Sequence, residues 1–200
     1  DQEIFSLEEL IREFDLNKVQ KSGAIFNALK LDWLNGYYLR QLTLDELVQR
    51  AIPFLKRDNL IGGGYYDFEY LKKILILEQP RLRKLGKIGE RVSYFFKIPK
   101  YKPEILVWRD MLFKDVVTSL KASLNTIFQI SDADFNQKNL EKILLKEAER
   151  AKNKDKGRLL WPLRAALTGL EASPGPFEIL EILGKEESVK RIEAAIKKLA

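Results

Sequence analysis

Apolar residues recur at helical spacing along almost the whole chain, and no stretch alternates long enough to predict a sheet. Ser6–Glu9 and Thr43–Glu46 are capping boxes, and the second predicts a helix to about Leu55. Further helices are expected at about 67–78, 104–120, 121–130, 135–152, 158–169, 177–183 and 187–199, with one more capped by Asn27. The chain is therefore predicted to be all-α.

Breaks in the periodicity divide these helices. The glycine run 62–64 and the polar loop 152–157 interrupt the pattern, and Asp134 is a candidate N-cap after a third break. Pro99 and Pro103 bracket a linker, which predicts two consecutive small helical bundles, one to about residue 100 and one beyond it. Gly169 and Gly184 are expected to end helices, whereas Pro162 must sit in a first turn or kink its helix.

Composition removes several classes of chemistry. The 200 residues are 46% apolar, which is enough for a real core, and they include neither cysteine nor histidine. Disulfides, thiol nucleophiles, Cys/His zinc sites and imidazole bases are therefore excluded. No apolar run is long enough to span a membrane. The chain begins at Asp1 and not at a methionine, and its first residues do not resemble a signal peptide. We therefore expect it to be part of a longer protein.

The positive charge is concentrated in one window. Residues 79–102 contain eight basic residues and one acid, a net charge of +7, so the rest of the chain nets −1 out of a total of +6. Such a cluster suits a polyanion, because each phosphate that it neutralises releases counterions. The alternative is an ordinary solvated helix face.

Four segments carry a family resemblance. "EIFSLEELIREFD", "KLDWLNGYYLR", "PLRAALTG" and "SPGPFEILEILGK" resemble the C-terminal half of bacterial glutamyl-tRNA synthetase, in the family's order and at close to its spacing. The match brackets the whole chain, although residues 100–160 match only as helical filler. The family's class I catalytic signatures are absent from this sequence.

The resemblance implies a division of labour. It assigns 1–42 to the end of a stem-contact region, and 43–100 and 101–200 to two helical anticodon-binding subdomains. The implied partner is glutamate tRNA, with no membrane, and the implied protein is a cytoplasmic monomer. ATP and magnesium would bind the parent glutamate–tRNA ligase elsewhere, so this part should be inactive alone. Two alternatives remain, a helical protein-interaction scaffold and a non-specific RNA-binding module, while glutamate-dependent pyrophosphate exchange by this chain would instead indicate an enzyme.

The resemblance also implies that Arg81 meets the third anticodon base. Glutamate tRNAs carry C there, whose edge offers the acceptors O2 and N3, whereas the G of glutamine tRNAs presents N1–H and N2–H₂ donors. A guanidinium has only donors, so it satisfies C and opposes G. The alternative is that Arg81 contacts phosphate or is simply a solvated helix residue.

A second set of residues is implied to surround the first and second anticodon bases. Arg164 is the charged member, and a stiff turn packs around the bases, formed by Ser173, Pro174, Gly175, Pro176 and Phe177. A Pro-Gly-Pro turn is rigid before binding and loses little entropy when RNA arrives. Pro176 departs from the leucine that is common in the family and removes one N–H donor. Alone, the turn is also explained as a tight interhelical corner.

The remaining candidates are phosphate contacts and aromatic side chains. Arg40, Arg83, Lys84 and Lys87 are the expected backbone-binding residues. Trp33 and Tyr37 lie four residues apart and are expected in the core, and Asn35-Gly36 is a candidate kink or end of their helix. Phe95 and Phe96 could stack on bases, but a core position is the favoured interpretation.

Overall fold

The computed structural model describes residues 2–19, 22–23, 25–62, 64, 66–150 and 155–199. The described residues contain helices and 3₁₀ turns but no strand, so the all-α prediction is confirmed. The α-helices are α1 (Leu7–Glu13), α2 (Ala28–Gln41), α3 (Leu44–Arg57), α4 (Phe68–Glu78), α5 (Ile88–Val92), α6 (Phe113–Phe128), α7 (Gln137–Ala148), α8 (Gly157–Thr168) and α9 (Pro176–Leu199). The 3₁₀ turns are η1 (Leu16–Lys18), η2 (Gln79–Arg81), η3 (Leu85–Lys87), η4 (Ser93–Phe95), η5 (Pro103–Leu106) and η6 (Asp132–Asp134).

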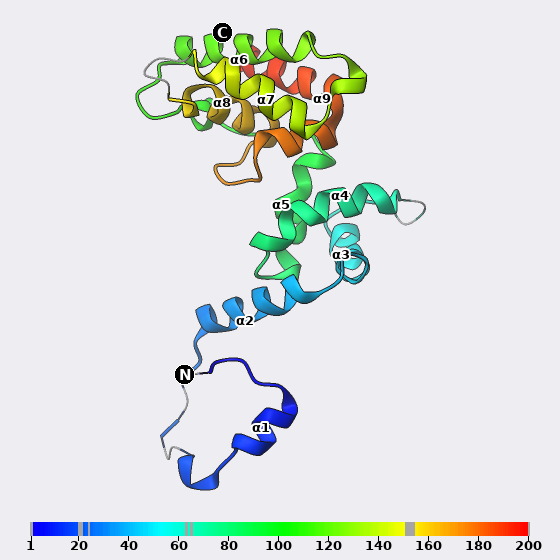
Figure 1. Cartoon of the computed structure of the whole chain (residues 1–200), viewed down its shortest axis with the longest axis vertical. Helices are drawn as coiled ribbons and strands as arrows, with labels where there is room; N and C mark the ends of the chain where they lie inside the picture. The colour runs from blue at the N-terminus through cyan, green and yellow to red at the C-terminus, as the bar shows by residue number, and fades with distance from the viewer. Residues whose placement is uncertain are drawn as a thin grey trace.

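The helices form an elongated molecule with two packed groups (Figure 1). In the lower group α3 packs against α4, α5 and η3, and in the upper group α6, α8 and α9 pack together with α7 alongside. Both groups bury aliphatic side chains completely, for example Leu47 and Ile74 in the lower one and Leu120 and Leu163 in the upper one. The chain crosses between them at residues 96–102, where it has no helix.

The segment that contains α1 stands apart from both groups, whereas α2 packs on the lower group through η2 (Figure 1). The predicted capping box closes α1, because Ser6 accepts from the backbone of Glu9 and the Glu9 carboxylate accepts from the Ser6 N–H. No residue of α1 is buried, and Leu7 and Ile11 are 73% and 70% exposed. Trp33 on α2 is 43% exposed, so its predicted place in the core is wrong.

Most expected helix ends are confirmed. Asn27 and Thr43 cap α2 and α3 through their side chains, and Asp67 does the same for α4. Gly169 ends α8 with φ 66°, and Gly184 interrupts α9 with φ 75° and ψ 166°. The predicted breaks at Gly63 and at 152–154 lie outside the described residues.

Two local predictions are wrong, and one of the two alternatives for Pro162 is excluded. A single helix, α6, replaces the two helices expected at 104–120 and 121–130. It begins later than expected because Arg109, with φ 50°, interrupts the helical backbone. The helix starts where the Asp115 carboxylate accepts a hydrogen bond from the Leu112 N–H at 2.9 Å. Asn136 rather than Asp134 caps α7, since Asp134 belongs to η6. Pro162 is buried at the sixth position of α8, past its first turn.

The linker is held against the end of α8. A Cβ at Gly169 would lie 2.8 Å from side-chain atoms of Pro99 and Tyr101. The Tyr101 hydroxyl donates to the Ala166 carbonyl at 3.5 Å, and the Lys198 ammonium lies 3.7 Å from the centre of the Tyr101 ring. The absence of a side chain at Gly169 therefore allows the linker to dock on the upper group.

Two glycine substitutions test this docking. We expect Gly169→Ala to destabilise the fold more than Gly184→Ala, because both residues have positive φ but only Gly169 is crowded. The backbone strain costs about 1–2 kcal/mol at Gly169, which is in the left-handed helical region with ψ 18°, and about 1–3 kcal/mol at Gly184, where ψ is 166°. Overpacking adds about 1–3 kcal/mol at Gly169 alone. Urea denaturation of both variants measures the difference, and equal losses would contradict the role given to the linker.

Candidate nucleic-acid interface

The basic turn after α4 is fixed on α2. A Cβ at Gly36 would lie 3.3 Å from the Leu82 carbonyl and 3.6 Å from the Arg83 Cα, so the two backbones approach closely here. The helix passes through Gly36 without a break, which makes the expected kink or end at this position wrong. The Gln79 amide donates to the carbonyls of Leu39 and Leu42 at 3.0 and 2.9 Å, and thereby satisfies the last turn of α2.

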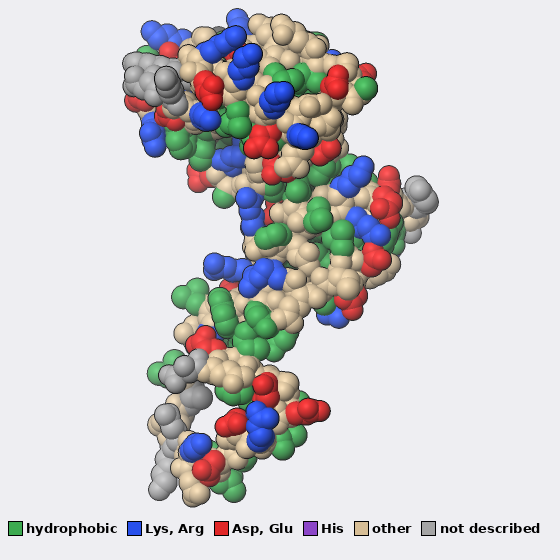
Figure 2. All heavy atoms as spheres, viewed as in Figure 1, with side chains coloured by type: hydrophobic (Ala, Val, Ile, Leu, Met, Phe, Trp, Pro, Cys, Tyr) green, Lys and Arg blue, Asp and Glu red, His purple; other side chains and the backbone are tan. Residues whose placement is uncertain are grey.

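A basic cavity of about 270 Å³ lies beside this contact, and Figure 2 shows blue side chains gathered at the waist of the molecule. Its lining consists of Asp32, Arg81, Leu82, Arg83, Lys84, Lys87 and Arg91. Lys84 pairs with Asp32 at 2.9 Å, and Lys87 pairs with Glu90 at 2.6 Å. In the described part of the chain neither Arg81 nor Arg83 has an ion-pair partner, so both exposed guanidiniums are available to an anion.

Arg164 on α8 is committed to the turn that follows its helix. Its guanidinium donates to the Ser173 hydroxyl and to the Glu171 carbonyl, both at 2.9 Å, and to the Leu170 carbonyl at 3.5 Å. Its other face lies 4.4 Å from the Trp161 ring. Arg164 is therefore held in one orientation before any ligand arrives.

Two tryptophans and a second arginine support that orientation, and the sequence analysis did not identify them. Trp161 packs on Trp108 with ring centres 4.9 Å apart and donates from its indole to the Ile105 carbonyl at 2.9 Å. The Arg109 guanidinium lies over the Trp108 ring, 4.9 Å from its centre. The spacing of Trp161 and Arg164, three residues apart on one helix, was the signal that could have revealed the first contact.

The turn at 173–177 is rigid and closely packed. Pro174 and Pro176 are buried, and Pro176 is the first residue of α9. The Ser173 hydroxyl donates to the Pro174 carbonyl at 3.1 Å. A Cβ at Gly175 would lie 2.5 Å from the Glu178 carboxylate, so this side chain, and not open space, covers the glycine. Phe177 is partly buried against the core.

Arg81 and Arg164 are 83 positions apart in the chain, and the charge of Arg81 acts on Arg164. Burial lowers the pKa of Arg164 from its ordinary value, and the positive charge of Arg81 is the next cause. The two guanidiniums are thus within electrostatic range across the junction of the two helical groups. Two like charges in a partly buried place favour a polyanion that neutralises both.

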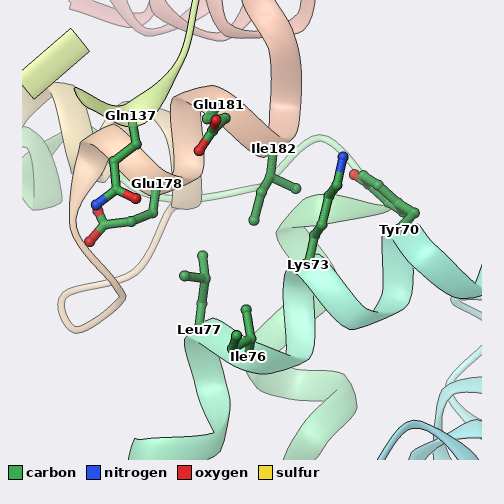
Figure 3. A pocket seen from close by; sticks show the side chains of 8 residues that line it. All are labelled: Tyr70, Lys73, Ile76, Leu77, Gln137, Glu178, Glu181 and Ile182. Carbon is green, nitrogen blue, oxygen red and sulfur yellow. The ribbon is translucent and has the colours of Figure 1, made fainter. Parts of the chain in front are cut away.

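A second cavity, of about 280 Å³, lies between α4 and the starts of α7 and α9 (Figure 3). Ile76, Leu77 and Ile182 form its apolar walls, while Glu178 and Glu181 face it from α9. The negative charges of these two carboxylates would repel a polyanion, so this cavity differs in its electrostatics from the basic cavity.

Comparison with known proteins decides the family. A family model described as "Anticodon binding domain" matches residues 46–196. The chain belongs to the anticodon binding domain family. The similar proteins described next are glutamate–tRNA ligases, so this chain is an anticodon binding domain of the kind that those ligases contain.

The relatives are all longer than this chain. The chain is 39% identical over 196 residues to glutamate–tRNA ligase 1 of Caldanaerobacter subterraneus subsp. tengcongensis, covering 98% of this chain and 40% of that ligase. It is 37% identical over 201 residues to the glutamate–tRNA ligase of Clostridium tetani, covering 99% and 39%. The crystal structure of a glutamate tRNA ligase from Elizabethkingia meningosepticum matches 100% of this chain and 38% of its own with a TM-score of 0.78 and 28% identity. The chain therefore spans about 40% of the length of these ligases.

The remaining candidate RNA-binding residues of this anticodon-binding chain, Arg40, Phe95 and Phe96, lie in different surroundings. Arg40 is exposed on α2, and its guanidinium lies 3.1 Å from where a Gly36 Cβ would be, beside the basic turn. Phe95 is buried with 6% exposure, so its predicted place in the core is confirmed. Phe96 is partly buried and meets the edge of Tyr70, with ring centres 6.2 Å apart.

Proposed function

We propose that this chain binds the anticodon loop of glutamate tRNA and contributes to its selection by the ligase of which it forms a part. The observation that carries the proposal is the basic cavity lined by Arg81 and Arg83, neither of which has an ion-pair partner among the described residues, with Arg164 held in a fixed orientation on the neighbouring helical group. Single-stranded RNA is recognised by splayed bases that stack on flat groups and bond along their edges. The junction offers flat guanidiniums and donors in one place.

Arg81 is the residue proposed to distinguish C from G. It is exposed, it has no ion-pair partner in the described part of the chain, and it is the last residue of η2, the turn that Gln79 anchors to α2. A long side chain on an anchored backbone can reach a base edge with its donors. C accepts these donors, whereas G presents donors of its own, and the mismatch is costly where water is excluded.

Arg164 is proposed to act with the turn at 173–177 as one preformed surface. Three of its hydrogen bonds already go to residues 170–173, so only part of its donor set remains for RNA. Its main contribution is then to hold Ser173, Pro174, Gly175, Pro176 and Phe177 in place, which reduces the entropy lost on binding.

The phosphate contacts are proposed to come from the basic cavity and from α2. Arg83 and Arg40 are exposed and have no ion-pair partner among the described residues. Lys84 and Lys87 are paired with Asp32 and Glu90, so a phosphate must share or replace those carboxylates. Exposed pairs of this kind contribute only about 0–1 kcal/mol, which a phosphate can exceed.

The chemistry of the ligase is proposed to lie outside this chain. Among the described residues no group of three or more acids could hold a metal ion, and none of the described helices is long and apolar enough to cross a membrane. Because this chain spans about 40% of the ligases that it resembles, glutamate, ATP and magnesium are proposed to bind the other part of a cytoplasmic, monomeric enzyme. The division into 1–42, 43–100 and 101–200 belongs to the same proposal.

The basic cavity predicts how binding responds to salt. Arg83→Glu with Lys87→Glu should flatten the log–log dependence of tRNA affinity on salt by about two units, because roughly one unit is lost per phosphate contact. Lys121→Glu with Lys146→Glu, on α6 and α7, is the matched control and should change the slope little. Filter binding measures both, and equal flattening by the two pairs would show that the cavity has no special role.

Arg81 predicts a change in base preference. Arg81→Gln adds an acceptor that can meet G and removes a charged donor from C, so the preference for C should shrink by about 1–3 kcal/mol. The measurement compares anticodon stem-loops with C or G as third base. Arg83→Gln is the control, since loss of a phosphate contact should weaken both stem-loops equally. An unchanged C-to-G ratio in Arg81→Gln would leave Arg81 only a phosphate role.

A further inference from the structure

The cavity of about 280 Å³ between α4 and α9 separates the two turns that carry the proposed RNA contacts. Ile76, near the end of α4, lines one side, and α4 continues directly into η2, whose last residue is Arg81. Ile182 lines the other side, on the helix that begins at Pro176 in the 173–177 turn. Because each turn is joined to one wall by a few residues, the width of the cavity sets the separation of the two turns.

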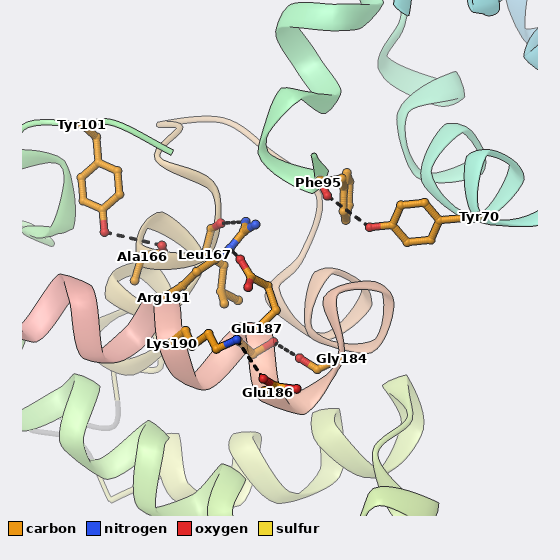
Figure 4. A network of polar contacts seen from close by, with 11 residues as sticks. Tyr70, Phe95, Tyr101, Ala166, Leu167, Gly184, Glu186, Glu187, Lys190 and Arg191 are labelled. Atoms are coloured by element: carbon orange, nitrogen blue, oxygen red, sulfur yellow. Dashed lines mark hydrogen bonds and ion pairs between the residues drawn. The ribbon is translucent and has the colours of Figure 1, made fainter. Parts of the chain in front are cut away.

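One end of the cavity is anchored. Tyr70 lines it from α4, and its hydroxyl donates to the Phe95 carbonyl at 3.2 Å (Figure 4). Phe95 belongs to η4, which packs on α8, and the Tyr101 hydroxyl of the following linker donates to the Ala166 carbonyl of α8 at 3.5 Å (Figure 4). The two helical groups are therefore held together at η4 and separated by open space on the side of the cavity.

The charges on the two walls are complementary. Lys73 projects from α4 and Glu181 from α9, with Ile182 between them (Figure 3). Both charged side chains are exposed, and in the described part of the chain neither has an ion-pair partner. Glu178 differs from Glu181, because its carboxylate lies against Gly175 and so belongs to the turn. Lys73 and Glu181 are thus the two unpaired opposite charges that face one another's helix across the cavity.

Two terms favour a narrower cavity. Ile76 is 54% exposed, so moving the walls together would remove apolar surface from water. The attraction between Lys73 and Glu181 would also grow as their separation falls. An RNA that contacts both the Arg81 turn and the 173–177 turn would draw the same two walls together, and its binding would add to both terms.

We propose that this cavity closes when RNA bridges the two turns, and that Lys73 and Glu181 are positioning residues that pair across it in the bound state. The packed contact of η4 with α8 is the pivot. Closure shortens the distance between the two turns and leaves the structure of each turn as it is. This inference rests on the proposed function and adds to it a conformational step.

Charge reversal tests the pair, and Glu181→Lys is the decisive variant. It should weaken binding of the anticodon stem-loop about fivefold, the upper end of what an exposed ion pair contributes. An added positive charge without a pair would instead strengthen binding of the polyanion, so the two explanations predict opposite signs. Lys73→Glu should weaken binding as well, and the two changes combined should restore the affinity of the wild type.

Glu141→Lys is the matched control. Glu141 is exposed on α7 outside this cavity, so its reversal adds the same charge to the same helical group without facing Lys73. It should leave the affinity unchanged or raise it slightly. The melting temperatures of all these variants without RNA should equal that of the wild type, because Lys73 and Glu181 are exposed and unpaired in the free chain.

A distance measurement tests the closure itself. The chain contains no cysteine, so spin labels can be attached specifically at Pro80→Cys, after α4, and Lys138→Cys, near the start of α7. The distance between the labels should shorten when the stem-loop is added, and it should shorten less in a Glu181→Lys background. Labels at Lys121→Cys and Lys138→Cys, both in the upper group, should keep their distance.

Three results would overturn the inference: an unchanged distance between the labels at 80 and 138 in a chain that binds RNA, a Glu181→Lys variant that binds as tightly as the wild type or more tightly, and a lower melting temperature of that variant without RNA, which would show that the pair already exists in the free chain. If the wild-type chain does not bind the stem-loop, the proposed function fails first, and the two failures are thereby distinguished.

Discussion

The docking of the linker and η4 on α8 is the contact on which the rest of the molecule depends. Each helical group has its own buried aliphatic residues, but the proposed RNA surface belongs to neither group alone. Arg81 comes from the lower group and Arg164 from the upper one. The space at Gly169 lets Pro99 and Tyr101 approach α8, and this approach holds the two helical groups together.

Bringing like charges together has an electrostatic cost, and the structure offsets it locally. Arg164 is satisfied by two carbonyls and a hydroxyl and stacks on Trp161. Arg91 and Arg191 are neutralised by Glu78 and Glu187. Arg81 has no such compensation among the described residues. A polyanion at this junction would therefore relieve repulsion as well as form new contacts, which ties the stability of the fold to its proposed ligand.

Local chemistry was predictable from the sequence, whereas contacts over long sequence distance were not. The caps at Ser6, Asn27 and Thr43 and the positive φ of Gly169 follow from residues a few positions apart. Gly36 looked like a helix break because its reason for being small, the backbone of Leu82 and Arg83, is more than forty positions away. The delayed start of α6 depends on Arg109 and its neighbour Trp108, which packs against Gly157. The nearness of Arg81 and Arg164 depends on the docked linker, which no local pattern encodes.

The central claim is that these two arginines form one site, and a double-mutant cycle tests it most directly. Anticodon stem-loop affinity is measured for the wild type, Arg81→Gln, Arg164→Gln and the double variant. One shared site predicts that the free-energy losses are non-additive, with an interaction energy of about 0.5–3 kcal/mol. Losses that add to within about 0.3–0.5 kcal/mol would show two independent contacts and would contradict the account.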